Sequence, residues 1–105
     1  LPPREDILDF ELSLMRKLIP GATWTAAGIG RDQFTVARWA LARGGHVRTG
    51  LEDNIRMDRH TLAPSNAALV RRTVELATEV GRPVADAATA RRILGLTALP
   101  MRRVA

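Results

Sequence analysis

Hydrophobic positions recur along the chain with a helical period in four segments, and two short apolar runs separate the first three of them. The first segment opens at Pro2-Pro3, since proline is tolerated in the first turn of a helix. Its hydrophobic side chains from Ile7 to Ile19 lie three and four positions apart, which predicts a helix of about four turns. Pro20 and Gly21 end this helix. The pattern predicts one buried face, made of Ile7, Leu8, Phe10, Leu12, Leu14, Met15, Leu18 and Ile19.

Two short runs, residues 23–30 and 46–51, are predicted to be buried strands. The first begins with β-prone residues and ends in glycines, which let backbone or a ligand approach closely. Between the runs, Asp32 is expected to cap a second helix, and Gly44 or Gly45 ends that helix in the left-handed conformation. The expected buried face of this helix contains Phe34, Ala37 and Leu41, with Trp39 and Ala40 beside them.

The second half of the chain predicts a polar loop over residues 52–63 and then two more helices. Ser65 or Asn66 caps the longer helix, which ends at Gly81, and Asp86 caps a short one that Gly95 closes. Residues 97–105 are expected to form a loosely held tail. The alternation of strands with helices predicts right-handed βαβ crossovers and a parallel sheet, so the fold class is α/β.

Two parallel strands make an incomplete sheet, because both outer edges stay unpaired. Neither predicted strand shows the polar alternation of a sheet with one face in water. The chain also begins at Leu1 rather than Met. We therefore expect residues 1–105 to be a single partial domain, the end of a larger α/β protein that has been processed or excerpted.

Composition narrows the class of protein further. The 105 residues are 46% hydrophobic and 26% charged, which is a globular composition. The absence of cysteine rules out disulfides and thiolate metal sites within this sequence. No apolar run reaches the ~18 residues of a membrane span, and no signal-peptide pattern opens the chain, so no membrane partner and a cytoplasmic location are expected.

The net charge of +5 comes from 16 basic and 11 acidic residues, and all but one of the basic residues are arginine. A basic balance suits nucleic acid, anionic lipid or an anionic small molecule. The arginines are scattered, however, and only four aromatic residues are available for base stacking. Nucleic-acid binding through Arg71, Arg72, Arg91 and Arg92 is therefore a disfavoured alternative.

The candidate chemistry lies at the end of the second predicted strand, where Arg48 is followed by Glu52, Asp53 and Asn54. In a regular strand Arg48 and Glu52 share a face about 13 Å apart at ~3.3 Å per residue. Glu52 and Asp53 then point to opposite faces unless Gly50 bends the chain. On spacing alone, the start of a polar loop is the favoured interpretation of the acidic pair, and a structural ion pair is the alternative for Arg48.

Five blocks of sequence together resemble the C-terminal part of the β-keto acid cleavage enzymes. They are WTAAGIGRDQ (24–33), GGHVRTGLEDN (44–54), LAPSNA (62–67), GRPVA (81–85) and ARRILGL (90–96). The second block is the most specific. The resemblance implies a (β/α)₈ TIM barrel, of which this chain supplies about the last two strands with their helices.

The resemblance also implies a reaction and a site. Members of this family use a divalent metal, usually Zn²⁺, held by two histidines from an early strand and one glutamate from a late strand. They convert a β-keto acid and acetyl-CoA to acetoacetate and a new acyl-CoA, and they are commonly oligomeric. Glu52 resembles the metal-binding glutamate, Asp53 the catalytic base, and Arg48 the arginine beside that base.

Much of that site is missing from the sequence. Catalytic zinc normally has three protein ligands, and a barrel needs about 250 residues. His46 and His60 do not match the ligand histidines and are interpreted as structural or solvated. The chain alone is therefore expected to be inactive without the N-terminal part of the barrel.

Other readings of the sequence stay open. The main alternative function is a small, basic, non-catalytic α/β module for binding or assembly. Gly28-Ile29-Gly30 lacks the third glycine of a dinucleotide loop and the lysine of a P-loop, so close packing is the expected role. The positive charges of Arg31 and Arg56 suit CoA phosphates, and charge is the one feature of the sequence that supports this role. The sequence does not determine the acyl group of the substrate.

Overall fold

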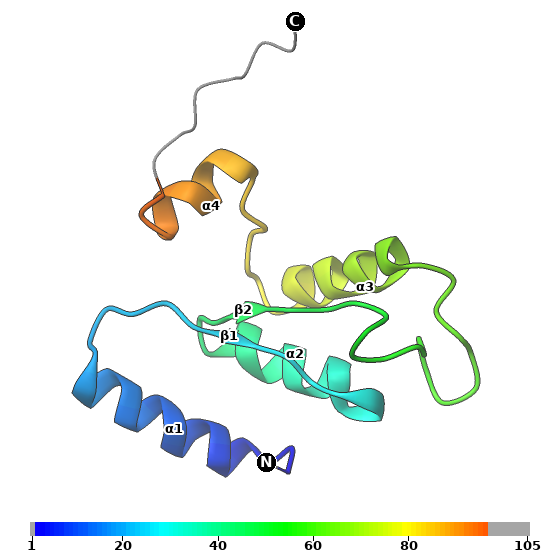
Figure 1. The fold of residues 1–105 in the computed structure, drawn as a ribbon, viewed down its shortest axis with the longest axis horizontal. Coiled ribbons are helices and arrows are strands. Elements are labelled where there is room, and N and C mark those ends of the chain that lie inside the picture. The colour runs from blue at the N-terminus through cyan, green and yellow to red at the C-terminus, as the bar shows by residue number, and fades with distance from the viewer. Residues whose placement is uncertain (1, 97–105) are drawn as a thin grey trace, which may run out of the picture.

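The computed structural model describes residues 2–96 and contains four helices and two short parallel strands in that range (Figure 1). In chain order they are α1 (Glu5–Leu18), β1 (Thr25–Ala26), the 3₁₀ turn η1 (Gly30–Asp32), α2 (Gln33–Ala42), β2 (His46–Val47), α3 (Asn66–Glu79) and α4 (Ala87–Ile93). The α/β class and the predicted element order are confirmed. The predicted tail at 97–105 lies outside the described residues.

The two strands pair in parallel, with Thr25 opposite His46 and Ala26 opposite Val47. The His46 N–H donates to the Trp24 carbonyl at 2.9 Å, and the Arg48 N–H donates to that of Ala26 at 3.0 Å. Both strands are shorter than predicted, because each has a single neighbour among the described residues and the chain turns soon after Val47.

The core lies on one side of this sheet, where α2 packs against α3. Ala37, Leu41, Leu76 and Ala77 form a buried cluster, against which Val47 also packs. Since successive strand residues point to opposite faces, His46 and Arg48 lie on the sheet face away from this core. That second face carries the exposed side chains of Thr25, Ala27, Ile29 and Arg48.

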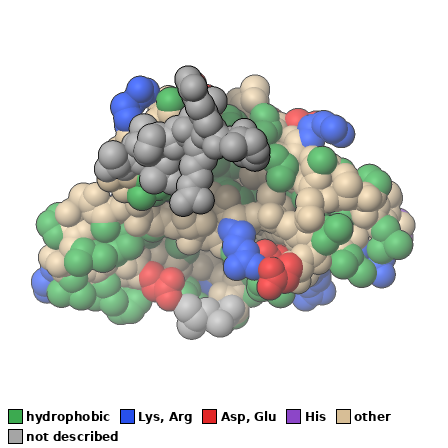
Figure 2. All heavy atoms as spheres, turned by 45° about the horizontal axis from the view of Figure 1, so that its top comes forward, with side chains coloured by type: hydrophobic (Ala, Val, Ile, Leu, Met, Phe, Trp, Pro, Cys, Tyr) green, Lys and Arg blue, Asp and Glu red, His purple; other side chains and the backbone are tan. Residues whose placement is uncertain are grey.

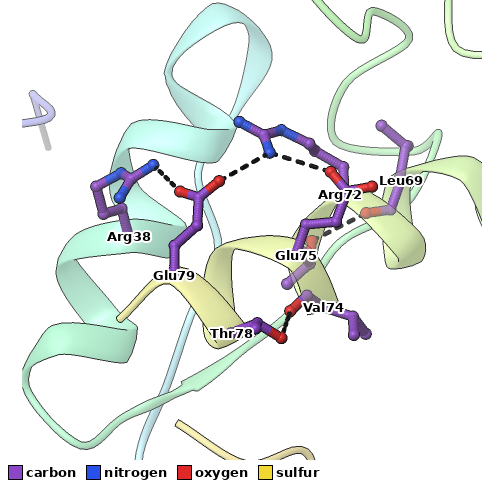
Figure 3. Close-up of polar contacts among 8 residues, drawn as sticks. Arg38, Leu69, Arg72, Val74, Glu75, Thr78 and Glu79 are labelled. Carbon is purple, nitrogen blue, oxygen red and sulfur yellow. Dashed lines mark hydrogen bonds and ion pairs between the residues drawn. The ribbon is translucent and has the colours of Figure 1, made fainter. Parts of the chain in front are cut away.

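Ion pairs join the polar edges of α2 and α3. Glu79 lies between Arg38 of α2, at 2.6 Å, and Arg72 of its own helix, at 3.5 Å. Arg72 also contacts Glu75 at 3.1 Å (Figure 3). At the other end of α2, Arg82 donates to the carbonyls of Leu41 and Gly45 at 3.0 and 2.8 Å. The two helices are thus tied at the edge of the core and at the end of α2.

The prediction of one buried face on α1 is wrong for most of its members. Only Leu12 is buried, whereas Phe10 and Leu18 are 63% and 72% exposed. The reason is that α1 has neighbours on one side only, and a cavity of about 500 Å³ separates it from β1 and α2. Ion pairs from Arg43 to Glu5 and Asp9 fix its position.

Local signals located the helix ends well. The Ser65 hydroxyl accepts from the Ala68 N–H, Asp86 accepts from the Thr89 N–H, and Gly44 closes α2 with a φ of 82°. Asp32 stands at the predicted position before α2, but its side chain makes no capping hydrogen bond. The preceding 3₁₀ turn gives its backbone φ and ψ of −92° and 0°, instead of the extended conformation usual for a capping residue.

Hydrophobic side chains remain on the surface of the described part. Hydrophobic side chains gather at both ends of the face in Figure 2. Exposed hydrophobic residues of the described part include Val70 and Val74 of α3 and Ile93 of α4. None of the residues of α4 is buried, and this helix stands apart from the others (Figure 1). No helix within residues 2–96 combines the length and apolarity needed to cross a bilayer.

Candidate functional site

A sharp turn follows β2 and shapes the candidate site. The N–H groups of Asp53 and Asn54 both donate to the Gly50 carbonyl, at 3.1 and 3.2 Å. The Leu51 N–H donates to the side-chain oxygen of Asn66, at the start of α3, at 2.7 Å. The chain therefore reverses direction at Gly50 instead of continuing as a strand.

This turn brings Arg48 between the two carboxylates that follow it. Arg48 Nη2 lies 3.0 Å from Glu52 Oε2 and 3.3 Å from Asp53 Oδ1, and Arg48 Nε lies 3.1 Å from Asp53 Oδ2. The expected 13 Å separation of Arg48 and Glu52 is wrong, because that estimate assumed an extended strand. The bend at Gly50 lets both carboxylates approach one guanidinium.

The two carboxylates differ in exposure. The Asp53 side chain is 8% exposed, whereas that of Glu52 is 84% exposed. Asp53 Oδ2 is buried and makes no well-aligned hydrogen bond despite its nearness to Arg48 Nε. Asp53 is thus a buried carboxylate with one oxygen still able to accept a hydrogen bond, which a general base requires, and Glu52 is an exposed carboxylate.

Main-chain and buried side-chain hydrogen bonds hold the strand ends together. The Gly30 N–H, after β1, donates to the Asp53 carbonyl at 2.8 Å. The Asn54 side chain donates to the Arg56 carbonyl at 2.7 Å and accepts from the Arg56 N–H at 3.1 Å. Its amide also lies 3.4 Å from Gln33 Oε1. Asp53 is therefore held by Gly30, which follows β1, and by the anchored Asn54 that comes directly after it.

Sequence reasoning missed two members of this support. Gln33 is 1% exposed, and its position four residues before the buried Ala37 places it on the apolar face of α2. This helical spacing in the sequence could have indicated that Gln33 is buried. Asn66 was considered only as a helix cap, and nothing in the local sequence indicates that its side chain would bind the turn at Leu51.

The described residues can supply one ligand of a metal site. Glu52 projects from the turn with an exposed carboxylate, which is a suitable zinc ligand. Residues 2–96 bring no three histidine, cysteine or acidic side chains together into a metal-binding group. His46 lies in β2 and His60 in the exposed loop after the site, where its N–H donates to the Asp58 carboxylate.

Glycines allow the close contacts behind the site. A Cβ at Gly28 would come within 2.6 Å of the Gln33 Cα, so the chain packs tightly where β1 leads into α2. The expectation that the glycines after the first strand serve close packing is confirmed at this residue. Gly30 differs, since it adopts a φ of 65° with open space around it.

After β2, the second of two parallel strands, the chain carries a buried carboxylate, an exposed carboxylate and an arginine that contacts both, an arrangement that suits an α/β protein whose functional groups follow its strands. A model of the β-keto acid cleavage enzyme family matches residues 1–96, and this chain belongs to that family. The resemblance read from the sequence is confirmed.

Curated relatives agree with this assignment. The chain is 58% identical to 3-oxoadipate:acetyl-CoA acetyltransferase of Cupriavidus necator over 94% of its length, covering 35% of that protein. It is 52% identical to 3-keto-5-aminohexanoate cleavage enzyme of Fusobacterium nucleatum, covering 82% of the chain and 32% of the relative. A more distant relative is 3,5-dioxohexanoate:acetyl-CoA acetone transferase of Paraburkholderia graminis, at 32% identity. The chain thus spans about a third of the length of these relatives.

Proposed function

We propose that this chain is the C-terminal part of a metal-dependent enzyme in which a β-keto acid and acetyl-CoA yield acetoacetate and a new acyl-CoA. The observation that carries the proposal is the pairing of Arg48 with Asp53 and Glu52 directly after β2, the second of the two parallel strands. The names of the relatives from Cupriavidus necator and Paraburkholderia graminis include acetyl-CoA, which supports the co-substrate.

The fold that this proposal requires is a (β/α)₈ barrel, with β1 and β2 as its last two strands. Parallel sheets are normally covered on both faces, and here helices cover one face only. The uncovered face bears Arg48 and the exposed Ile29, and it would become the barrel interior. The apolar surface left on α1 would then pack against the preceding part of the barrel.

In the proposed site each residue has a distinct role. Asp53 removes the acidic proton on the carbon between the ketone and the carboxylate of the substrate, and Arg48 orients the Asp53 carboxylate through its contacts with both oxygens. Glu52 supplies one ligand of a divalent ion, most simply Zn²⁺, whose other ligands come from outside the described residues. The ion would stabilise negative charge on the ketone oxygen.

The test uses the full-length polypeptide that carries these residues, with 3-oxoadipate and acetyl-CoA as substrates. Asp53→Asn should lower kcat by about 10²–10⁴-fold, the usual contribution of a general base, without changing zinc content. Glu52→Gln should lower the zinc content measured by atomic absorption. Glu75→Gln, an exposed ion-paired glutamate of α3, is the matched control and should match the wild type.

Two results would overturn the proposal. An Asp53→Asn variant with wild-type turnover would show that Asp53 is not the general base. A wild-type protein that binds β-keto acids or other proteins but forms no acyl-CoA would instead favour the non-catalytic binding module.

A further inference from the structure

A second cavity opens at the same end of the strands, beside the candidate site. It measures about 420 Å³, and the side chains around it belong to η1, the start of α2 and the loop after Asp53. Its lining contains Arg31, Asp32, Phe34, Asn54, Arg56, Met57, Asp58 and Arg59. Asn54 of this lining also supports Asp53, and Phe34 also packs against the core, but the arginines of the lining have no role in the proposed chemistry.

The charges around this cavity favour an anion. Three arginines line it, and within residues 2–96 none of Arg31, Arg56 and Arg59 forms an ion pair. Two carboxylates also line it. That of Asp58 is already engaged, because it accepts from the His60 N–H at 2.8 Å, and this bond together with contacts from Thr61 lowers its pKa. Both carboxylates keep their negative charge, so the three guanidinium groups outnumber the carboxylates of Asp32 and Asp58 by one.

The cavity also has an apolar part and a helix end. Phe34 and Met57 are both half-buried in its wall, where a flat aromatic ligand can pack against them. The cavity lies at the first turn of α2, whose backbone N–H groups carry the positive end of the helix dipole. A ligand with both a planar ring and phosphate groups matches this combination better than a small carboxylate does.

The cavity and the candidate site are neighbours along the backbone. Gly30, which donates to the Asp53 carbonyl, directly precedes Arg31, and Asp53 directly precedes Asn54. The cavity and the candidate site therefore lie on either side of the hydrogen bond from Gly30 to Asp53. A long molecule bound in the cavity can extend its other end toward Asp53 across the rim formed by this bond.

We propose that this cavity binds the phosphorylated adenosine end of acetyl-CoA, with Arg31, Arg56 and Arg59 holding its phosphates. The inference rests on the proposed function and adds to it the residues that recognise the co-substrate. A 3′-phosphate carries about −1.5 to −2 charge at pH 7, and arginine binds such groups with paired, charge-assisted hydrogen bonds.

The test measures CoA binding to the full-length polypeptide by isothermal titration calorimetry, with dephospho-CoA as the second probe. Arg31→Gln, Arg56→Gln and Arg59→Gln should each weaken CoA binding about tenfold or more, the usual scale for a charged hydrogen bond. The wild type should prefer CoA to dephospho-CoA, and at least one variant should lose that preference. Arg71→Gln, an exposed arginine on α3, is the matched control and should change affinity less than about twofold.

The outcomes separate this inference from the proposed function. If no acyl-CoA forms but the three variants weaken CoA binding, the cavity assignment stands and the enzyme proposal fails. If the enzyme is active and the variants leave the KM for acetyl-CoA unchanged, the cavity assignment fails alone. It also fails if the variants raise the KM only for the β-keto acid, since the arginines would then bind the acid. All three arginines are exposed, so unchanged thermal midpoints are expected and serve as the folding check.

Discussion

Gly45 shows how a single residue limits what the chain can accommodate. This glycine is buried between α2 and β2, and a Cβ built on it would lie 2.3 Å from the ring of Trp24. Its φ is not positive, so the restriction is steric and not conformational. The glycine is needed because an indole ring of the neighbouring segment occupies the space where a side chain would begin.

Gly45→Ala should therefore destabilise the protein by about 1–3 kcal/mol, the usual cost of overpacking. Denaturant unfolding of the full-length polypeptide measures this loss. A second variant, Gly45→Ala with Trp24→Leu, should cost less than the sum of the two single changes, because the smaller side chain removes the clash. Strict additivity would show that the indole is not the obstacle.

Arg82 is a second residue whose effect follows from its contacts. One of its nitrogens donates to the carbonyls of both Leu41 and Gly45, which closes the end of α2 onto β2. Arg82→Ala should lower the free energy of unfolding by about 1–3 kcal/mol, because two carbonyls lose a charged donor. Arg71→Ala, which removes an exposed arginine elsewhere, should change it by less than about 0.5 kcal/mol.

At the scale of elements, the packing of α2 on α3 provides the described core. Leu76 is 1% exposed within the cluster that joins the two helices, whereas Val70 on the same helix is 49% exposed. Leu76→Ala should cost about 2–5 kcal/mol in denaturant unfolding, through lost burial and the cavity left behind. Val70→Ala is the control, and an equal loss in both variants would mean that this part of α3 is packed differently.

The ion pairs at the edge of this interface predict a pH dependence. The hydrogen bond from Arg38 and the charge of Arg72 lower the pKa of Glu79 below its ordinary value of 4.5. A lowered pKa in the folded state stabilises the protein above the unfolded value, and this contribution disappears as the pH falls through the folded value. The stability difference between wild type and Glu79→Gln should thus be present at pH 7 and fade below about pH 4.5.

The Glu79 effect should be small, because the carboxylate is exposed, and salt should weaken it further. Thermal unfolding of both proteins from pH 7 to pH 3, at low and high salt, measures it. A difference that persists at pH 3 would indicate that Glu79 contributes through packing instead of charge.

The sequence identified helices and their ends because those signals are local. Ser65, Asp86 and Gly44 act on N–H groups or backbone angles within a few residues, so each could be assigned without knowing the fold. Burial depends on neighbours distant in sequence, which is why Phe10 was assigned to a buried face and lies exposed. The family could be recognised from sequence blocks, but the turn at Gly50 that joins Arg48 to Glu52 depends partly on Asn66 in the next helix.

At the scale of the whole molecule, the exposed hydrophobic residues test the proposed barrel. Phe10 is 63% exposed here but would pack against preceding barrel elements in the full-length polypeptide. Phe10→Ala should therefore cost about 3–5 kcal/mol in the full-length protein, as for a buried aromatic residue. Lys17→Ala on the same helix is the control, and a loss within about 0.5 kcal/mol for both would contradict burial of this face.

The hydrogen bond from Gly30 to Asp53 has a consequence for how such a protein can change over evolution. Its donor and acceptor both belong to the main chain, so no exchange of side chains removes it, with the exception of proline at residue 30. A φ of 65° at that residue already excludes proline. The side chains of the loops on either side can therefore diverge, while the distance between the two strand ends is inherited unchanged.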